Sequence, residues 1–340
     1  MLKRLTNAFG PSGCEDEVRE IVLKEIRPFC DSITIDKMGN VIAFKKGRDS
    51  SKKFMADAHM DEVGLIVKTV TEDGYLKFDE VGGIDSRLLL GKRVFVGEKR
   101  TPGVIGIKAV HLTTKEERTT VLKIKDMYID IGCTSRDEAL EFAAKGDFIV
   151  FDSDYVEFGE DMIKAKALDD RAGVAILIEL LKAAPAYDFY AVFSVQEEIG
   201  LLGAKVAANA IRPDYALIVE STICADICDV EEHLQVTKIG SGPVLSVMER
   251  TSSATVEMRG FIEKIAESEG IPYQYKRSGS GGNNAGSVQI AGGGVQTATL
   301  SVPCRYLHSP GCVISRGDFE KAKKLAVAIC ERMDEICLKN

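Results

Sequence analysis

Two of the four histidines stand in sequence contexts that favour metal binding. His59 follows a short apolar run and opens the sequence His-Met-Asp-Glu, in which Asp61 lies two residues on. An imidazole can bind a metal ion through one ring nitrogen while the other donates a hydrogen bond to a carboxylate, which fixes the ring orientation. His308 follows a second apolar run. His59 and His308 are therefore candidate metal ligands, and Asp61 is a candidate orienting group.

Carboxylates occur at three comparable positions. Asp169 and Asp170 precede a predicted helix, Glu197 and Glu198 follow a predicted strand, and Glu220 ends another. An aspartate before a helix can cap it or bind metal, and because both residues suit the cap, one can cap while the other binds. Two adjacent glutamates raise each other's pKa unless cations offset their charge. That pair can supply one metal ligand and one general base.

The candidate ligand set mixes two imidazoles with three carboxylates: His59, Asp169, Glu198, Glu220 and His308. This mixture suits zinc, cobalt or manganese, and it lacks the thiolates of a structural zinc site. A site for two metal ions needs one shared ligand and about two further ligands for each ion. The set satisfies that count. The other histidines, His111 and His233, are expected to be structural or exposed, although His111 could reach an active site from an inserted lid.

The elements that must position these residues alternate between strands and helices outside one inserted segment. Strands are predicted at 53–58, 189–195, 215–219 and 295–302, and helices at 15–27, 171–183, 200–210, 255–268 and 319–338, with a hairpin at 32–45. This alternation predicts a doubly wound α/β sheet with helices on both faces. Ligand residues at strand ends would then meet in the crevice at the carboxyl edge of the sheet.

Between residues 70 and 164 the pattern changes to short β-like runs separated by glycine-rich turns, with one short helix expected near 135–144. This segment is predicted to be a small β-barrel inserted into the larger domain, which would comprise residues 1–69 and 165–340. The glycine-rich stretch Ser278–Gly286 is expected to be a loop, and its spacing does not fit a phosphate-binding loop.

Composition excludes several classes of function. The net charge of −8 disfavours nucleic acids and anionic membranes as partners, because both would repel the protein. No apolar run approaches the ~18 residues that a membrane span needs, and residues 1–10 contain no apolar block typical of a secretory signal. Nine cysteines without a regular spacing are expected to be free thiols. Together these features predict a cytoplasmic protein.

Four separated motifs resemble those of the tetrahedral (TET) aminopeptidase family, which includes glutamyl aminopeptidases and proteins once labelled endoglucanase M. They are His59–Gly64, Ala167–Arg171, Gln196–Gly200 and Arg305–Pro310, and the resemblance runs nearly the whole length of the chain. It implies a phosphorylase/hydrolase-like catalytic domain with an inserted β-barrel dimerisation domain. It also implies a metallo-aminopeptidase that acts on peptides and forms homodimers, which assemble into a tetrahedral homododecamer.

The resemblance also implies a role for each residue of the predicted site. One metal ion would take His59, Asp169 and Glu220, and the other would take Asp169, Glu198 and His308. Glu197 would be the general base and Asp61 would steer His59. The chain departs from the family pattern at Glu220, where aspartate is common, at Asn283-Asn284, where the family tends to carry Thr-Asp, and at Gly311-Cys312.

Three other functions compete with a metallo-aminopeptidase. A glycosidase would use two carboxylates without metal, which leaves the histidines without a purpose, and the chain has no Trp to stack on sugar rings. A two-metal amidohydrolase acting on acylated amino acids fits the same ligand set, and only its need for a blocked amine separates it from an aminopeptidase. A non-catalytic assembly protein would require the ligand set to be accidental.

Overall fold

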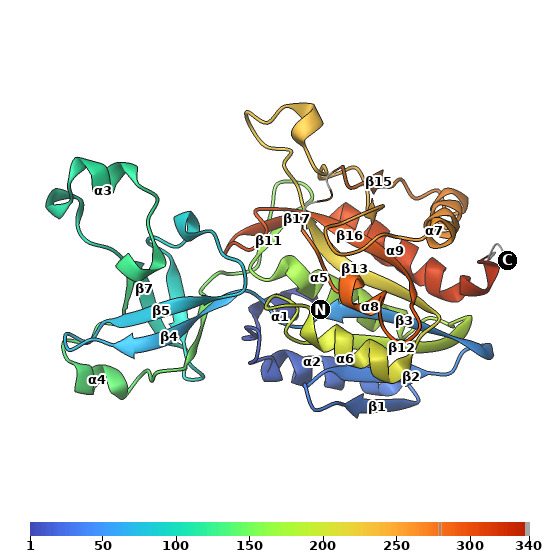
Figure 1. Ribbon diagram of the computed structural model, residues 1–340, viewed down its shortest axis with the longest axis horizontal. Coiled ribbons are helices and arrows are strands. Elements are labelled where there is room, and N and C mark those ends of the chain that lie inside the picture. The colour runs from blue at the N-terminus through green and yellow to red at the C-terminus, as the bar shows by residue number, and fades with distance from the viewer. Residues whose placement is uncertain (278, 280, 337–340) are drawn as a thin grey trace.

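The computed structural model describes residues 1–277, 279 and 281–336. Figure 1 shows two parts, a large α/β part that contains both ends of the described chain and a smaller β part that projects from one side of it. The predicted α/β fold with an inserted β-barrel is confirmed.

The described residues of the α/β part contain one twisted mixed sheet of eleven strands. In spatial order its main path is β1 (Ser32–Ile35), β2 (Val41–Lys45), β12 (Tyr187–Ser194), β3 (Asp49–His59), β13 (Tyr215–Ile223), β16 (Gln296–Arg305), β17 (Cys312–Ser315), β11 (Met162–Ala165) and β10 (Val156–Phe158). Two short strands, β14 (Val244–Ser246) and β15 (Gln274–Tyr275), extend from β16. The four strands β12, β3, β13 and β16 run parallel, so their carboxyl ends share one edge.

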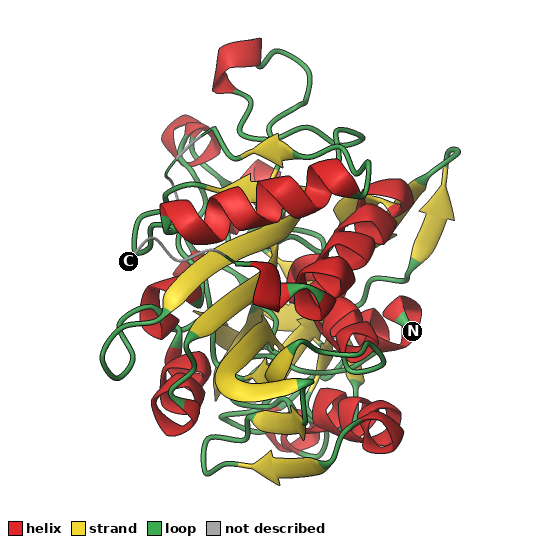
Figure 2. Cartoon of the chain, turned by 90° about the vertical axis from the view of Figure 1, so that its right-hand side faces the viewer, coloured by secondary structure: helices red, strands yellow, loops and turns green. Residues whose placement is uncertain are grey.

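Helices cover both faces of the sheet (Figure 2). One face packs against α1 (Leu2–Asn7), α2 (Asp16–Ile26), α5 (Leu168–Leu180), α7 (Val256–Ser268) and α9 (Arg316–Glu331). The other face packs against α6 (Leu202–Ile211) and α8 (Ala285–Val288). The period of a strand explains this division, since Phe54 and Ala56 of β3 join the first core and Met55 between them joins the second.

The smaller part is a closed six-stranded barrel with its own apolar core. Its antiparallel strands are β4 (Gly64–Val70), β5 (Leu76–Val81), β8 (Tyr128–Asp130), β7 (Thr101–Gly106), β6 (Arg93–Val96) and β9 (Phe148–Phe151). Two short helices, α3 (Lys115–Thr119) and α4 (Arg136–Leu140), lie in its connections.

The barrel strands are shifted relative to the predicted inserted segment, 70–164. Strand β4 already begins at Gly64, and near the predicted end β10 pairs with β11, which in turn pairs with β17 of the large sheet. Short β-like runs look alike in sequence whichever sheet they join, so their pairing could not be predicted. The predicted final helix 319–338 is also shorter, because α9 ends at Glu331, and residues 337–338 lie outside the described residues. No helix in the described part of the chain is long and apolar enough to cross a membrane.

Candidate active site

The carboxyl edge of the parallel strands brings the predicted ligands together. His59 is the last residue of β3 and pairs in register with Ser194, the last residue of β12. Glu197 and Glu198 follow β12, and His308 follows β16. Glu220 lies inside β13 rather than at its end, because the strand continues to Ile223 alongside β16. Only Asp169 comes from a helical segment, the start of α5.

Asp169 lies between the two imidazoles. Its Oδ1 is 3.3 Å from Nε2 of His59, and its Oδ2 is 3.3 Å from Nε2 of His308. Each imidazole also faces a glutamate: Glu220 Oε1 is 3.5 Å from His59 Nε2, and Glu198 Oε2 is 3.3 Å from His308 Nε2. The five predicted ligands therefore form one cluster in which a central carboxylate faces one imidazole with each oxygen.

Several buried carboxylate oxygens in this cluster have no hydrogen-bond donor among the described residues, namely Asp169 Oδ1, Asp170 Oδ2 and Glu198 Oε1. Asp170, which the sequence offers as a helix cap, also belongs with His59 and Glu220 to one of the two groups of described residues whose potential metal-ligand atoms all lie within 4.8 Å of one another. Buried oxygens normally have partners. Imidazole nitrogens and unpaired carboxylate oxygens are the donor set that divalent transition metals take, so the residues present fit bound cations.

The charges of the cluster lead to the same conclusion. Burial, with the nearby carboxylates, raises the pKa of both Glu197 and Glu198 to about 8. Burial and Asp169 also raise the pKa of Glu220. Although burial opposes protonation of His308, the hydrogen bond to Asp169 and the charge of Glu198 raise its pKa to about 10. Protein groups alone therefore leave the site short of positive charge, and cations would relieve this shortage.

Asp61 holds several parts of the site in place. Its Oδ1 is 3.3 Å from His59 Nδ1, and its backbone carbonyl is slightly closer, at 3.1 Å. Its carboxylate also accepts hydrogen bonds from the backbone N–H groups of Glu197 and Glu198, both at 3.1 Å, and from the Ser12 hydroxyl at 2.5 Å. The sequence predicted only the first of these contacts. Asp61 thus links the end of β3 to the segment that carries the glutamate pair.

The two aspartates in the first turn of α5 divide the roles of capping and facing the site. Asp170 Oδ1 accepts a hydrogen bond from the backbone N–H of Gly173 at 2.9 Å, which is a capping contact three residues on. A side chain at Gly173 would collide with this carboxylate, since its Cβ would lie 2.3 Å from Oδ2. Asp169, joined to Asp170 by a cis peptide bond, is left to face the histidines.

A cavity of about 510 Å³ opens beside the cluster. Its lining includes the five predicted ligands and Glu197, and it extends to residues 249–251, Lys276 and the glycine-rich loop at 281–283. Asn284, one of the positions at which the chain departs from the family pattern, does not line this cavity. Its side chain is buried and donates hydrogen bonds to Asp57 Oδ2 at 2.7 Å and to Ser194 Oγ at 3.0 Å. Asn284 therefore anchors the loop to the sheet, and Asn283 is the one of the two that lines the cavity.

The remaining candidates lie elsewhere. His111 is in an exposed connection of the barrel, and His233 is exposed beside Glu231. The described cysteines are free; Cys337 lies outside the described residues.

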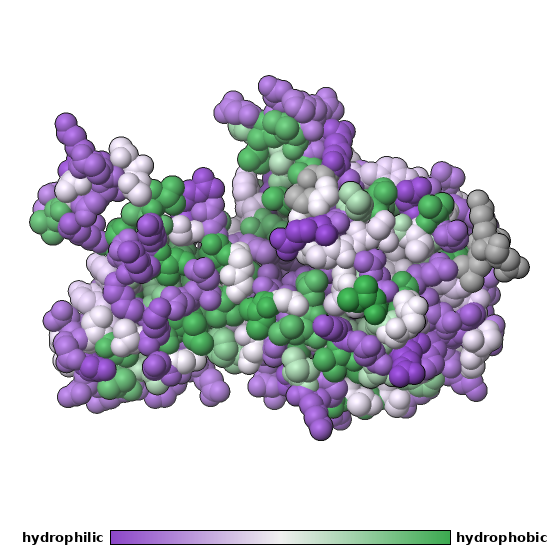
Figure 3. All heavy atoms as spheres, viewed as in Figure 1, coloured by the Kyte–Doolittle hydropathy of each residue, from purple (hydrophilic) through white to green (hydrophobic). Residues whose placement is uncertain are grey.

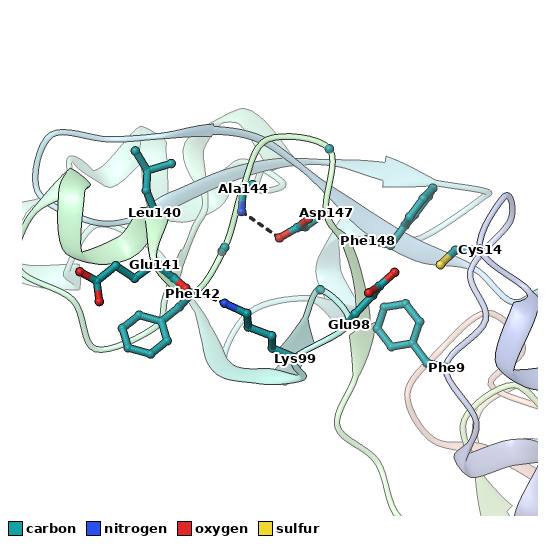
Figure 4. A pocket seen from close by; sticks show the side chains of 13 residues that line it. Phe9, Cys14, Glu98, Lys99, Leu140, Glu141, Phe142, Ala144, Asp147 and Phe148 are labelled. Carbon is teal, nitrogen blue, oxygen red and sulfur yellow. Dashed lines mark hydrogen bonds between the residues drawn. The ribbon is translucent and has the colours of Figure 1, made fainter.

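A second groove, of about 440 Å³, separates the barrel from the N-terminal segment of the α/β part (Figure 4). Apolar side chains gather along this junction in the space-filling view (Figure 3), and the groove is lined by Phe9, Phe142 and Phe148 together with charged residues such as Lys99. Burial raises the pKa of the Cys14 thiol on its wall, which makes the thiol a poor nucleophile. No histidine lines the groove, so the cavity beside the ligand cluster is the candidate active site.

Comparisons with known proteins agree with this geometry. The sequence profile of the M42 glutamyl aminopeptidase family matches residues 39–325. A relative from Acetivibrio thermocellus that carries an aminopeptidase name is 41% identical over 333 residues, covering 97% of this chain and 98% of its own. The structure of a TET aminopeptidase from a marine-sediment archaeon of the Thaumarchaeota superposes with a TM-score of 0.95 at 34% identity, covering 98% of this chain and 96% of its own.

A further solved structure is a TET1 peptidase from Pyrococcus horikoshii, described as able to assemble into a tetrahedron or a large octahedral shell. It has a TM-score of 0.86 at 36% identity, and the match covers 97% of this chain and 98% of that one. The family profile covers most of the chain. The similar proteins are named as peptidases, and they match this chain over nearly their whole length. The chain belongs to the M42 glutamyl aminopeptidase family and is an enzyme that hydrolyses peptide bonds as an aminopeptidase.

Proposed function

We propose that this aminopeptidase uses two divalent metal ions to remove N-terminal residues from peptides. The observation that carries the proposal is the position of Asp169, which offers one oxygen to each of the two histidines at 3.3 Å. A carboxylate so placed is arranged to bridge two cations. His59, Asp169 and Glu220 would hold one ion, and Asp169, Glu198 and His308 would hold the other.

The ligand types favour zinc or cobalt, with manganese also compatible, since imidazole and carboxylate bind all three. Glu220 carries one methylene more than the aspartate common in the family, which changes its reach. The described cysteines are free thiols rather than disulfides, which supports a cytoplasmic setting.

Bound metal ions would supply Lewis-acid activation of a water molecule and of the scissile carbonyl. Glu197 lines the cavity beside the ligands, and its side chain is almost fully buried. It accepts a proton from the attacking water and then delivers that proton to the leaving amine. Asp61 is a positioning residue in this reaction, because it holds the backbone of Glu197 and the ring of His59.

The test of this mechanism is Glu197→Gln, which keeps the shape of the side chain and removes the base. We expect kcat on aminoacyl-anilides to fall by about 10²- to 10⁴-fold, with metal content and thermal unfolding unchanged. Glu267→Gln, at an exposed position of α7, is the matched control and should retain full activity. Turnover within tenfold of the unmodified enzyme would remove Glu197 from this role.

The requirement for a free amine separates an aminopeptidase from an amidohydrolase that acts on acylated amino acids. Matched peptides with free and acetylated N-termini should differ, and only the free ones should be cleaved. Activity should disappear on chelation and return with zinc, cobalt or manganese. Faster cleavage of the acetylated peptides would favour the amidohydrolase, and full activity without metal would contradict the two-metal proposal.

We also propose that the barrel is a dimerisation domain and that dimers assemble into a tetrahedral homododecamer. The similarity to proteins named as TET peptidases supports this assembly. Apolar side chains left exposed on the long connection of the barrel, including Val110, Leu112 and Val121, supply surface that such contacts would cover. Sedimentation velocity should show a species about twelve times the mass of the chain. A stable monomer at micromolar concentration would contradict the proposal.

A further inference from the structure

A second charged pair lines the active-site cavity away from the predicted ligands. Glu249 follows β14 and Lys276 follows β15. These two short strands pair in parallel, with Val244 opposite Gln274, so the residues just beyond their carboxyl ends come together. The ion pair joins Lys276 Nζ to Glu249 Oε1 at 2.8 Å.

The pair is buried although it lines a cavity. The side chain of Glu249 is 2% exposed and that of Lys276 is 6% exposed. Ser246 Oγ donates a second hydrogen bond to Glu249 Oε1, at 2.9 Å. The other oxygen, Oε2, has no donor within the described residues. A buried carboxylate oxygen without a donor is costly, and a ligand group that reached it from the adjoining cavity would supply the missing donor.

Glycines let the two loops on this side of the cavity approach each other closely. A Cβ at Gly281, which has a φ of +80°, would lie 3.8 Å from Lys276 Nζ. Cβ atoms at Gly282 and Gly286 would lie 2.9 and 2.3 Å from Thr251 Oγ1. The glycine-rich loop therefore packs directly against the segment that carries Glu249. Because Gly281 and Gly282 have no side chains, the cavity extends past them to the ion pair.

We infer that the Glu249–Lys276 pair receives the side chain of the substrate's N-terminal residue and selects a neutral polar group, the primary amide of glutamine or asparagine. This inference rests on the proposed function, since it needs a peptide with its N-terminus at the ligand cluster. The amide N–H₂ would donate to Glu249 Oε2, and the amide oxygen would accept from Lys276 Nζ.

The chemistry of the pair disfavours the other side-chain classes. The pair carries no net charge, so an acidic side chain would be attracted by Lys276 but repelled by Glu249, and a basic one the reverse, and neither would gain a full opposite charge. An aliphatic side chain would expel water and leave both buried groups without a new partner. Arg250 also lines the cavity but is exposed, so solvent screens its attraction for an acidic substrate.

The experiment compares kcat/KM on the p-nitroanilides of glutamine, leucine, glutamate and lysine. The unmodified enzyme should prefer glutamine over leucine by about 10- to 100-fold. The variant Glu249→Leu/Lys276→Met removes both charges together, so that neither is left buried and unpaired. This preference should then disappear or reverse, mainly through KM. Lys53→Met, which removes a lysine that bonds to the Ile211 carbonyl outside the cavity, should leave the preference unchanged.

Each result decides the inference. A glutamine-to-leucine ratio that is the same in the double variant and the unmodified enzyme would overturn it while leaving the proposed function intact, as would a preference of the unmodified enzyme for glutamate or lysine. If no anilide is cleaved with any metal, the proposed function fails and the inference falls with it. A folded double variant, checked by thermal unfolding, that has lost the glutamine preference alone would support it.

Discussion

The two parts of the molecule differ in how many charged side chains they bury. Thr101 is the one buried polar side chain between residues 64 and 151, a range that the structure describes completely. The α/β part instead buries many charged groups, among them Lys166, Arg171 and Glu62 as well as the ligand cluster. Buried charges weaken a fold unless each is paired and hydrogen-bonded. The barrel is therefore held together by apolar packing, whereas the stability of the α/β part depends on keeping its buried charges paired.

The buried network beneath the site shows how this part keeps its charges in place. Lys166 Nζ contacts both oxygens of Glu62, at 2.6 and 2.8 Å, and the carbonyl of Ala8 at 2.8 Å. Arg171 donates to the carbonyls of Leu5 and Met60. These bonds tie the N-terminal segment to the residues that follow His59. The network thus supports the loop that carries Asp61.

The largest effect should come from breaking this network with Lys166→Met. The Glu62 carboxylate would lose its nearest cation, and we expect the free energy of unfolding to fall by about 3–5 kcal/mol. Lys68→Met is the control in the barrel, because it breaks the exposed Lys68–Asp79 pair at 2.7 Å and should cost less than about 1 kcal/mol. Urea unfolding of both variants checks the comparison. Similar losses at the two sites would show that the two parts do not differ in this way.

The next effect concerns the apolar core of the barrel. Ile129 is fully buried there, and Ile129→Ala should lower the free energy of unfolding by about 2–5 kcal/mol. Turnover per folded chain should stay near that of the unmodified enzyme, because Ile129 is remote from the ligands. A hydrogen bond joins the barrel side to the site, between the Gly83 carbonyl and His308 Nδ1 at 2.8 Å. A tenfold loss of kcat in folded protein would mean that packing in the barrel acts through that contact.

A smaller effect should follow from Asp61→Asn in the α/β part. The variant keeps the volume but loses the carboxylate that accepts from Ser12 and from the glutamate backbone. Changes in groups that orient metal ligands typically cost about 10- to 100-fold in metal affinity or activity. Metal titration and kcat/KM should both show the loss, whereas Asp130→Asn on the barrel should show none. An unchanged metal affinity would remove Asp61 from the positioning role.

The smallest effect is a pH dependence of stability at Glu15. Burial raises the pKa of this carboxyl from 4.5 to about 7. The folded chain therefore holds a proton there that the unfolded chain has released, and stability is lost as the pH rises from about 5 to 8. Glu15→Gln cannot lose this proton, so its melting temperature relative to the unmodified protein should increase over that interval. A constant difference between pH 5 and pH 8 would contradict the assignment, and Glu72→Gln, exposed on the barrel, is the control.

The sequence by itself predicted the architecture and most of the clustered residues, whereas the place of Asp170 beside His59 and Glu220 came from the fold. Apolar runs that alternate with amphipathic segments predicted the α/β sheet, and the change of pattern predicted the inserted barrel. His59, Glu198 and His308 were found because the carboxyl ends of parallel strands share one edge, which is a local rule that needs no coordinates.

Pairing between distant short segments was decided only by the tertiary structure. Strands β10, β11 and β17 joined the large sheet, and β14 and β15 placed Glu249 beside Lys276, because register depends on partners far away in sequence. The same holds for Asn284, a departure from the family pattern, whose side chain hydrogen-bonds to Asp57 instead of lining the cavity. Residue types thus predicted which chemistry the chain can perform, whereas the long-range packing decided which side chains face the substrate.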